Sequence, residues 1–163
     1  MEKGTVIMIC GLPGAGKTTL AKKLEKERHA VRLCADEWII GVLKDKSDIA
    51  EADRLRDPVE QMLWRLAQKL VLLGTNAILE NGFWTATGRK IYVDKARELG
   101  VGIELHFLEA SYDKLLERLV KRNANLPQGD FEIDLKKLKE WHKVFEPPTN
   151  EEAKAFDFFK KYE

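Results

Sequence analysis

The sequence predicts an α/β fold in which a parallel sheet carries helices on both of its faces. Strand-like and helical hydrophobic periods alternate from the first residues onward, as they do in βαβ units. The first predicted strand, TVIMIC over residues 5–10, is apolar at nearly every position, which is typical of a strand buried on both faces. A length of 163 residues suits one domain, so we expect residues 1–163 to fold as a single unit.

The first half of the chain begins with that strand and with a glycine-rich turn that opens a helix. Leu20, Ala21 and Leu24 share one face of this helix, and a short β-rich segment follows it. The pattern predicts, in chain order, a strand over 5–10, a helix over 17–29, a strand over 30–33, a helix over 38–43 and a polar, exposed connection over 44–53.

Capping and stop signals mark the helices of the second half. Asp57 and Pro58 form a helix start, with the proline at the first helical position, and Gly74 ends that helix. The later strand over 101–108 alternates apolar with polar positions, so we expect it to have one wetter face at a sheet edge. The predicted elements are a helix over 58–73, a strand over 77–79, a helix over 86–99, a strand over 101–108, a helix from Ser111 through 119, a mobile loop over 122–130, a helix over 134–145 and a short helix capped by Thr149.

Composition and charge narrow the classes of function. Lys and Arg number 28 against 27 Asp and Glu, a net charge of +1, which argues against a protein that grips nucleic acid by bulk charge. The longest apolar run, residues 6–10, is far too short to cross a bilayer, and the first residues lack a signal sequence. We therefore expect a cytoplasmic protein without a membrane partner. Two cysteines do not make a disulfide framework, and the three histidines lack the spacing of a zinc site.

One motif carries the chemistry. Residues 11–18, GLPGAGKT, match the phosphate-binding loop G-x-x-x-x-G-K-[ST], and they follow a predicted buried strand and open a helix. The glycines let backbone N–H groups turn inward around phosphate oxygens. Lys17 would then bridge the β- and γ-phosphates of ATP, and the Thr18 hydroxyl would ligate Mg²⁺. The residues expected to contact the nucleotide are Gly11, Leu12, Pro13, Gly14, Ala15, Gly16, Lys17, Thr18 and Thr19.

Carboxylates follow the second and third predicted strands, at the edge of a parallel sheet where ligands bind. Asp36 could take the proton of an acceptor hydroxyl as this attacks the γ-phosphate. Alternatively Asp36 only caps the next helix, and Glu37 is the weaker candidate for the base. Glu80 could stand near the Mg²⁺ ion or remain a strand-end carboxylate in solvent. Three further side chains could line a pocket for the acceptor, the alternative being a turn and an ordinary exposed helix residue: Asn81, Trp84 and Arg89.

Two arginines, Arg118 and Arg122, stand four residues apart and hence on one face of a predicted helix. On a lid over residues 118–133, they could close over the transferring phosphoryl group, exclude water and neutralise developing charge. The alternative is a solvated helix face shared with Glu117 and Lys121.

Together these segments resemble a family, the small P-loop kinases of the predicted-kinase type (AAA_33-like ATP-binding proteins). These are related to chloramphenicol phosphotransferases, zeta-toxin-like kinases and polynucleotide kinases. The matching segments are GLPGAGKTTLAKKL, RLCADEW, ILENGFWTATGRK, ELHFLEASYDKLLERLVKRN and FEPPTNEE. The resemblance implies a P-loop NTPase fold of the small-kinase type and an ATP-dependent phosphotransferase. It also implies that Asp36 is the general base and that Arg118 and Arg122 belong to the lid.

The chain departs from this family in two places. Glu80 stands where the relatives usually have aspartate. The C-terminal segment AFDFFKKYE contains no clear fifth strand. The edge-like fourth strand agrees with a four-stranded core ordered 2-3-1-4, or with a poorly formed fifth strand.

The sequence thus predicts a kinase that uses ATP and Mg²⁺ and phosphorylates a hydroxyl of a small-molecule acceptor, which neither the motifs nor the family identifies. Two other functions stay open. A polynucleotide 5′-hydroxyl kinase is disfavoured by the low net charge and by the lack of an aromatic stacking platform. An ATP-binding regulatory switch with slow hydrolysis is the second, although the absence of N-K-x-D disfavours a GTPase switch. A toxin that phosphorylates a cell-wall nucleotide sugar also fits the fold, but the sequence contains no partner antitoxin to support it.

Overall fold

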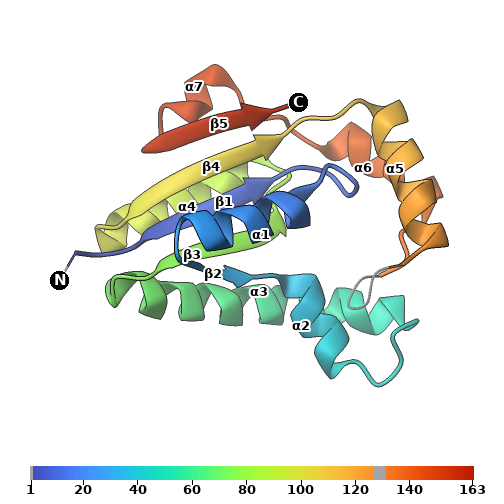
Figure 1. The fold of residues 1–163 in the computed structure, drawn as a ribbon, viewed down its shortest axis with the longest axis horizontal. Helices are drawn as coiled ribbons and strands as arrows, with labels where there is room; N and C mark the ends of the chain where they lie inside the picture. The colour runs from blue at the N-terminus through green and yellow to red at the C-terminus, as the bar shows by residue number, and fades with distance from the viewer. Residues whose placement is uncertain (1, 127–130) are drawn as a thin grey trace.

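A single parallel sheet organises the protein, as seen in a computed structural model that describes residues 2–126 and 131–163. Within these residues the sheet has five strands in the order β2-β3-β1-β4-β5, and every neighbouring pair is parallel (Figure 1). The strands are β1 (Thr5–Cys10), β2 (Ala30–Leu33), β3 (Asn76–Gly82), β4 (Gly102–Leu108) and β5 (Phe158–Tyr162). The α/β class and the order 2-3-1-4 are confirmed, and the sheet extends beyond them by β5.

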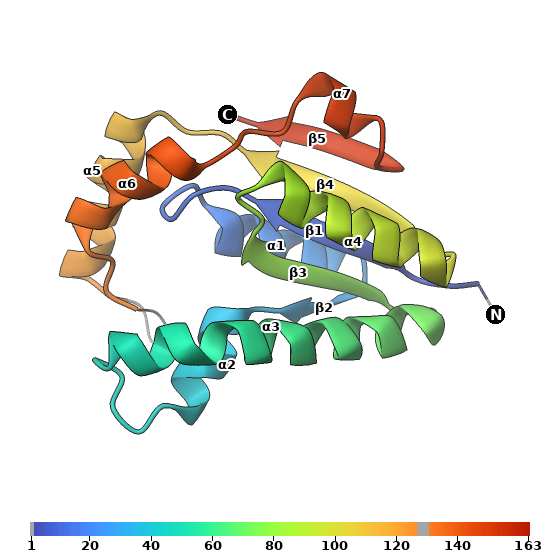
Figure 2. The same ribbon diagram turned by 180° about the vertical axis from the view of Figure 1, so that it is seen from behind.

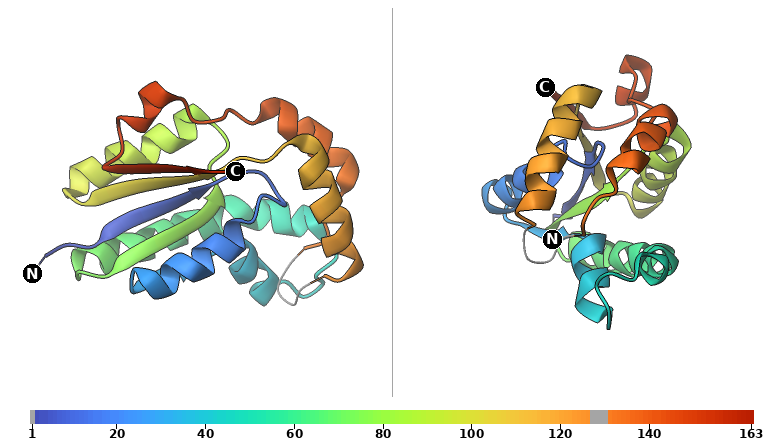
Figure 3. Two further views of the ribbon diagram at one scale, coloured as in Figure 1. Left: turned by 45° about the horizontal axis from the view of Figure 1, so that its top comes forward. Right: turned by 90° about the vertical axis from the view of Figure 1, so that its right-hand side faces the viewer.

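Helices cover both faces of the sheet, also as predicted. They are α1 (Lys17–Glu27), α2 (Ala35–Val42), α3 (Ile49–Leu72), α4 (Ala86–Leu99), α5 (Tyr112–Ala124), α6 (Leu135–Val144) and α7 (Asn150–Ala153). Helix α1 lies on one face, and α3 and α4 lie on the other, which faces the viewer in Figure 2. The helices α2, α5 and α6 stand beyond the carboxyl ends of the strands, as both views of Figure 3 show. This end of the sheet therefore carries the loops that can form a site.

The central strand β1 belongs to both halves of the core. Val6, Met8 and Cys10 pack into the apolar cluster under α3 and α4, while Ile7 and Ile9 pack into the cluster under α1. All five side chains are fully buried. Because burial of one such side chain stabilises a fold by about 1.5–3 kcal/mol, this short segment anchors the sheet. The two cysteines of the chain are free and buried.

The edge of the sheet differs from the sequence prediction. The strand β5 pairs with β4 from Glu104 opposite Phe158 to Leu108 opposite Tyr162, so β4 lies inside the sheet. The predicted wetter face of β4 is accordingly wrong, because β5 and the elements around it bury Glu104 and His106. The side chains of β5 are half-buried or exposed. Pairing with β4, and not burial of its own side chains, makes this segment a strand.

The start of α3 was also predicted wrongly. The helix begins at Ile49, where the Asp48 side chain accepts a hydrogen bond from the backbone N–H of Glu51. Pro58 therefore lies inside the helix and not at its first position. The proline leaves the carbonyl of Arg54 without its usual helical donor. Pro58 is exposed, so water can satisfy that carbonyl, and the predicted connection over 44–53 is in part helical.

Two other helix boundaries differ from the prediction. Helix α2 begins at Ala35, before the predicted start near 38, and α5 continues through Ala124 where a loop from 122 was expected. Part of that predicted loop, residues 127–130, lies outside the described residues. In the part of the chain that the structure describes, no helix has both the length and the apolar character needed to cross a membrane.

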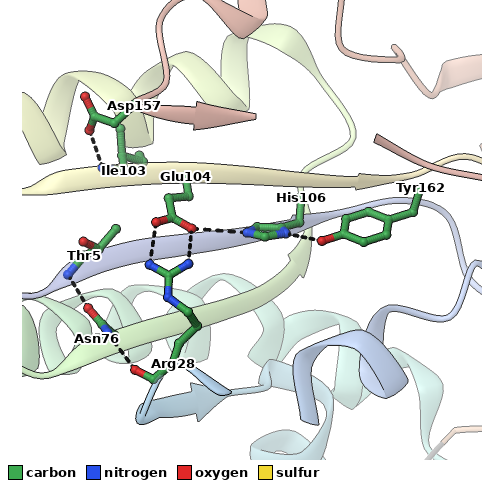
Figure 4. Close-up of polar contacts among 8 residues, drawn as sticks. All are labelled: Thr5, Arg28, Asn76, Ile103, Glu104, His106, Asp157 and Tyr162. Atoms are coloured by element: carbon green, nitrogen blue, oxygen red, sulfur yellow. Dashed lines mark hydrogen bonds and ion pairs between the residues drawn. The ribbon is translucent and has the colours of Figure 1, made fainter. Parts of the chain in front are cut away.

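A chain of polar side chains joins the C-cap of α1 to β4 and β5 (Figure 4). Two guanidinium nitrogens of Arg28 donate to the Glu104 carboxylate at 2.9 and 2.7 Å. His106 Nε2 lies 3.3 Å from the same carboxylate, and its Nδ1 lies 2.8 Å from the Tyr162 hydroxyl. An ionised carboxylate only accepts hydrogen bonds, so Nε2 donates to Glu104, and in the neutral ring Nδ1 then accepts from Tyr162. The centroid of the His106 ring also lies 5.4 Å from that of the Phe158 ring. The contacts with Tyr162 and with Phe158 therefore hold β5 on β4 at two points.

This network makes stability sensitive to acid. Burial opposes ionisation of Glu104, but the hydrogen bonds from His106 and Arg28 outweigh it and lower the pKa of Glu104 to about 2. A native pKa below the ordinary 4.5 stabilises the fold at pH values above 4.5, and this contribution is lost as the pH falls from 4.5 towards 2. We expect it to be about 3 kcal/mol at neutral pH. Urea unfolding of Glu104→Gln between pH 7 and pH 2.5 should show lower stability at pH 7 and a flatter acid limb.

The matched control is Glu109→Gln, because Glu109 follows β4 directly and pairs with Lys161 of β5 at the surface. We expect this variant to keep the steep acid limb of the wild type, since exposed pairs contribute little. An unchanged acid limb in Glu104→Gln would contradict the assignment.

Candidate functional site

The phosphate-binding motif forms the turn between β1 and α1, at the carboxyl edge of the sheet. Gly14 has a φ of +84°, and a Cβ there would lie 3.0 Å from Leu119 Cγ and 3.2 Å from the carbonyl oxygen of Leu115. Gly16, with a φ of +100°, is the N-cap of α1 and supplies no side-chain cap. The first N–H groups of α1 are therefore open to an anion, which is the arrangement that binds phosphate at a helix N-terminus.

Lys17 stands at the start of α1, where its Nζ donates to the carbonyl oxygen of Leu12 at 3.1 Å. Burial lowers the pKa of Lys17, and the nearby carboxylates of Glu80 and Asp36 oppose this change. The ammonium group thus lies against its own loop and is close to both carboxylates. A phosphate chain in the loop would offer it a stronger partner than the carbonyl does.

Glu80 lies within β3, two residues before this strand ends at Gly82, and its side chain is buried, with 4% exposure. The interpretation of Glu80 as a solvated strand-end carboxylate is therefore wrong. Its Oε1 accepts a hydrogen bond from the Thr18 hydroxyl. Its Oε2 accepts from Arg32 Nη1 at 2.9 Å, and Arg32 Nη2 donates to Glu37 at 2.5 Å. Four side chains from α1, β3, β2 and α2 are thus linked directly beside the phosphate-binding loop.

The oxygens of Thr18 and Glu80 suit a magnesium ion. Hydroxyl and carboxylate oxygens are hard donors, and Mg²⁺ is usually held by one or two such protein groups together with phosphates and water. Over residues 2–126 and 131–163, no three His, Cys, Asp or Glu side chains converge as a metal site. Phosphate oxygens and water molecules usually complete the octahedral shell of Mg²⁺.

Asp36 lies in the first turn of α2, one residue after the helix begins. The N-cap is Cys34, which makes no side-chain capping bond, so the predicted alternative of Asp36 as the cap is not what the structure shows. The Asp36 Oδ1 accepts from Arg56 Nη2 at 3.0 Å, and the side chain is 49% exposed. One oxygen is held by α3 and the carboxylate remains accessible. This is a suitable arrangement for a group that receives a proton from a bound molecule.

Helix α3 contributes a second carboxyl group to this region. Burial raises the pKa of Glu60 to about 7, Arg56 opposes the change, and Asp57 and Asp36 reinforce it. The charge of Glu60 therefore changes near neutral pH, close to Asp36. Sequence reasoning missed Arg56 and Glu60, although their spacing of four residues places them on one helix face. The misplaced start of α3 left Arg56 outside the predicted helix.

The two predicted lid arginines point to different partners. Arg118 Nη1 lies 3.3 Å from the carbonyl oxygen of Gly14 and 3.4 Å from that of Ala15, so it reaches the phosphate-binding loop. Arg122 Nη2 donates to the carbonyl oxygen of Phe131 at 3.0 Å, beyond the end of α5. The structure thus brings Arg118 to the loop and directs Arg122 towards the segment that leads to α6. The charge of Arg122 is still close enough to Lys17 to add to the lowering of the pKa of this lysine by burial.

A cavity of about 510 Å³ opens beside the loop, on the side of α1. Its size falls within the usual range for small-molecule sites. Its lining includes loop residues, the exposed side of α1 and the guanidinium of Arg118: Gly14, Ala15, Gly16, Thr19, Leu20, Lys23, Leu108 and Arg118. Four of the nine predicted contact residues, Gly14, Ala15, Gly16 and Thr19, therefore share this cavity with Arg118.

The three residues predicted to line an acceptor pocket have different surroundings in the structure. Arg89 is completely buried, donates to both carboxylate oxygens of Glu152, and donates to the carbonyl oxygen of Phe83 at 2.8 Å. Both predicted roles for Arg89, pocket lining and an ordinary exposed position, are therefore wrong, because α7 covers it. The ring of Trp84 packs against that of Trp141 in α6, with 5.7 Å between the two ring centroids.

Asn81 differs from both of these residues. Among the described residues, its side-chain oxygen and nitrogen are buried without a hydrogen bond of good geometry. Burial raises the pKa of the Tyr92 hydroxyl, and the interaction of this hydroxyl with Asn81 opposes the change. Asn81 thus keeps two unsatisfied polar atoms directly after Glu80, where a bound molecule could pair with them.

The strand order, the phosphate-binding loop and the acid beside Thr18 define a P-loop protein of the small-kinase class. Residues 6–148 match the family model AAA_33, described as an AAA domain, and the chain belongs to this family. This confirms the family resemblance found in the sequence.

Similar proteins agree with that class. A relative from Aeropyrum pernix, described as "Probable adenylyl-sulfate kinase", is 27% identical over 158 residues, which are 92% of this chain and 81% of the relative. An "Adenylate kinase" from Streptococcus pneumoniae is 28% identical over 166 residues, 95% of this chain and 73% of the relative. A solved structure from Chloroflexus aurantiacus has a TM-score of 0.74 at 20% identity, covering 99% of this chain and 86% of that one.

Proposed function

We propose that this protein is an ATP-dependent phosphotransferase that moves the γ-phosphate of ATP to a hydroxyl group of a small molecule. One observation supports this most strongly. The phosphate-binding loop and the Thr18–Glu80 pair lie at the same sheet edge as Asp36, which is accessible. Kinases need such a juxtaposition, because phosphoryl transfer is catalysed mainly by positioning and by charge stabilisation.

The nucleotide would bind through groups that the structure already gathers. The N–H groups of the loop and the first turn of α1 would hold the phosphates, and Lys17 would leave the Leu12 carbonyl to contact the β- and γ-phosphates. Thr18 and Glu80 would hold Mg²⁺, which neutralises charge on the phosphate oxygens. The cavity lined by Leu20, Lys23 and Arg118 would take the nucleoside.

The acceptor would approach from the side of α2 and α3. Its hydroxyl proton would pass to the free oxygen of Asp36, its oxygen would bond to the γ-phosphorus, and ADP would leave with the electrons of the broken P–O bond. Arg56 would hold the other oxygen of Asp36 at its present 3.0 Å. Arg118 and Arg122 would neutralise the charge that develops on the transferring group.

Release of ADP from Mg·ATP, with and without pooled acceptors, tests this function. The pools are sugars and other metabolites, nucleosides, antibiotics and a 5′-hydroxyl oligonucleotide. We expect one small-molecule pool to raise the rate, and we expect Lys17→Met to lower that rate about 10²-fold or more by removing a charge from the reacting phosphates. The matched control is Lys22→Met, which removes an exposed lysine from the same helix outside the cavity lining.

Stimulation by the oligonucleotide alone would replace the proposal by a polynucleotide kinase. A slow rate indifferent to every pool would favour an ATP-binding switch. Equal activity of Lys17→Met and the wild type would contradict phosphoryl transfer at this loop.

A further inference from the structure

Arg32 has no part in the function proposed so far, yet it lies at the centre of the site. Its side chain is 10% exposed, and it bridges the buried Glu80 to Glu37. The pairing of β2 with β3 explains this position. Arg32 lies opposite Ile78, and Glu80 is two residues further along β3 on the same face.

The guanidinium controls the direction of the Glu80 carboxylate. A carboxylate can rotate about its terminal bond, so one fixed oxygen decides where the other one points. Arg32 holds Oε2 at 2.9 Å, and the free oxygen, Oε1, then meets the Thr18 hydroxyl. In the described part of the chain, Glu80 forms no other hydrogen bond or ion pair. Without Arg32, a buried carboxylate would lose its counter-charge as well as its orientation.

The second terminal nitrogen of the Arg32 guanidinium reaches the helix that carries Asp36. Arg32 Nη2 donates to Glu37, which is next to Asp36 in the first turn of α2. A planar guanidinium holds its two partners in a fixed relation, whereas a lysine ammonium could not. The acid beside Thr18 and the first turn of α2 are therefore joined through one rigid group.

We propose that Arg32 is a positioning residue of the metal site, which turns Glu80 towards Mg²⁺ and Thr18 and ties that acid to the first turn of α2. The proposal rests on the proposed function, because it takes Thr18 and Glu80 as the groups that hold Mg²⁺. It adds a side chain that touches neither metal nor nucleotide. Groups that orient metal ligands typically change metal affinity or activity 10–100-fold when they are replaced.

Binding of a fluorescent ADP analogue, titrated with Mg²⁺ and repeated in EDTA, tests this role without any acceptor. We expect Arg32→Gln to need about 10–100-fold more Mg²⁺ for half-maximal tightening of nucleotide binding. Nucleotide affinity in EDTA should stay within about twofold of the wild type, because the loop itself is unchanged. Arg32→Lys keeps the positive charge but not the planar guanidinium with its two donor nitrogens, and we expect an intermediate shift in the Mg²⁺ requirement.

A matched control separates this effect from the loss of any arginine. Arg54→Gln removes an exposed arginine on α3 that pairs with Glu51, and it should leave both titrations unchanged. Thermal unfolding without nucleotide shows whether each variant is folded, and Arg32→Lys remains informative if Arg32→Gln is not.

The outcomes divide clearly. A wild-type Mg²⁺ requirement in both Arg32 variants would overturn the proposal. An equal loss of affinity with and without Mg²⁺ would also overturn it, by showing that Arg32 only supports the fold. If the wild type binds nucleotide with no dependence on Mg²⁺, the proposed kinase site itself fails, which differs from a failure of Arg32 alone.

Discussion

Replacement of Asp36 by alanine is expected to lower the rate constant of phosphoryl transfer by about 10²–10⁴-fold, the usual contribution of a general base. Affinity for Mg·ATP should remain within a few-fold of the wild type, because Asp36 lies on α2 and contacts Arg56, whereas the phosphates would bind to the loop after β1. The measurements are acceptor-stimulated ADP release under saturating ATP and equilibrium binding of Mg·ATP.

Two further variants make the result specific. Asp57→Asn removes a nearby carboxylate from α3 and should leave transfer within about threefold of the wild type, since exposed charges contribute little. Glu37→Gln tests the alternative base. Transfer that survives in Asp36→Ala but is lost in Glu37→Gln would assign the proton to Glu37, and near wild-type transfer in both variants would remove the base from this turn.

Replacement of Arg89 by methionine should have the largest effect on stability, lowering the free energy of unfolding by about 3–5 kcal/mol. The buried guanidinium donates to Glu152 and to the carbonyl of Phe83. Phe83 has a φ of +49°, a conformation rare for such a residue, and its carbonyl also accepts from the Cys10 thiol. Methionine would fill most of the space, but it would leave the Glu152 carboxylate without its guanidinium donor and the Phe83 carbonyl with only the weak Cys10 thiol donor.

Arg97→Met is the matched control, because Arg97 lies on the same helix and pairs with Asp157 at the surface. We expect it to cost about 1 kcal/mol or less in urea unfolding. The double variant Arg89→Met, Glu152→Gln should recover part of the loss, since it no longer leaves a charged carboxylate unpaired. Equal stability of Arg89→Met and Arg97→Met would contradict the buried clamp.

The contrast between Lys17 and Arg89 shows what could be predicted from the sequence. The phosphate-binding loop depends on local backbone geometry, so consecutive residues announce both its shape and its position between a strand and a helix. The roles of Lys17 and Thr18 in binding stay predictions, but their placement at the sheet edge follows from the motif. Arg89 finds its partner 63 residues away in a helix of four residues. No local pattern carries that information.

The same distinction explains β5 and Arg32. Residues 158–162 have neither a buried apolar run nor a turn signal, and they become a strand only because β4 offers an unpaired edge. Arg32 looks like a polar position of a short strand until β3 places Glu80 beside it. Pro58 misled in the opposite direction, because a strong local signal for a helix start lies on the exposed side of a longer helix.

The central position of β1 has a consequence for synthesis on the ribosome. This strand pairs with β3 and β4, and the partner of Val6 in β3 is Ala77, so β1 is made about 70 residues before its first neighbour. At roughly 5–20 residues per second, translation leaves it unpaired for about 4–14 s. During that interval the nascent chain displays TVIMIC, a hydrophobic strand with two open edges. Nascent-chain chaperones would therefore meet an exposed apolar segment here, and slower translation of residues 11–76 would lengthen the interval in which the chain can aggregate.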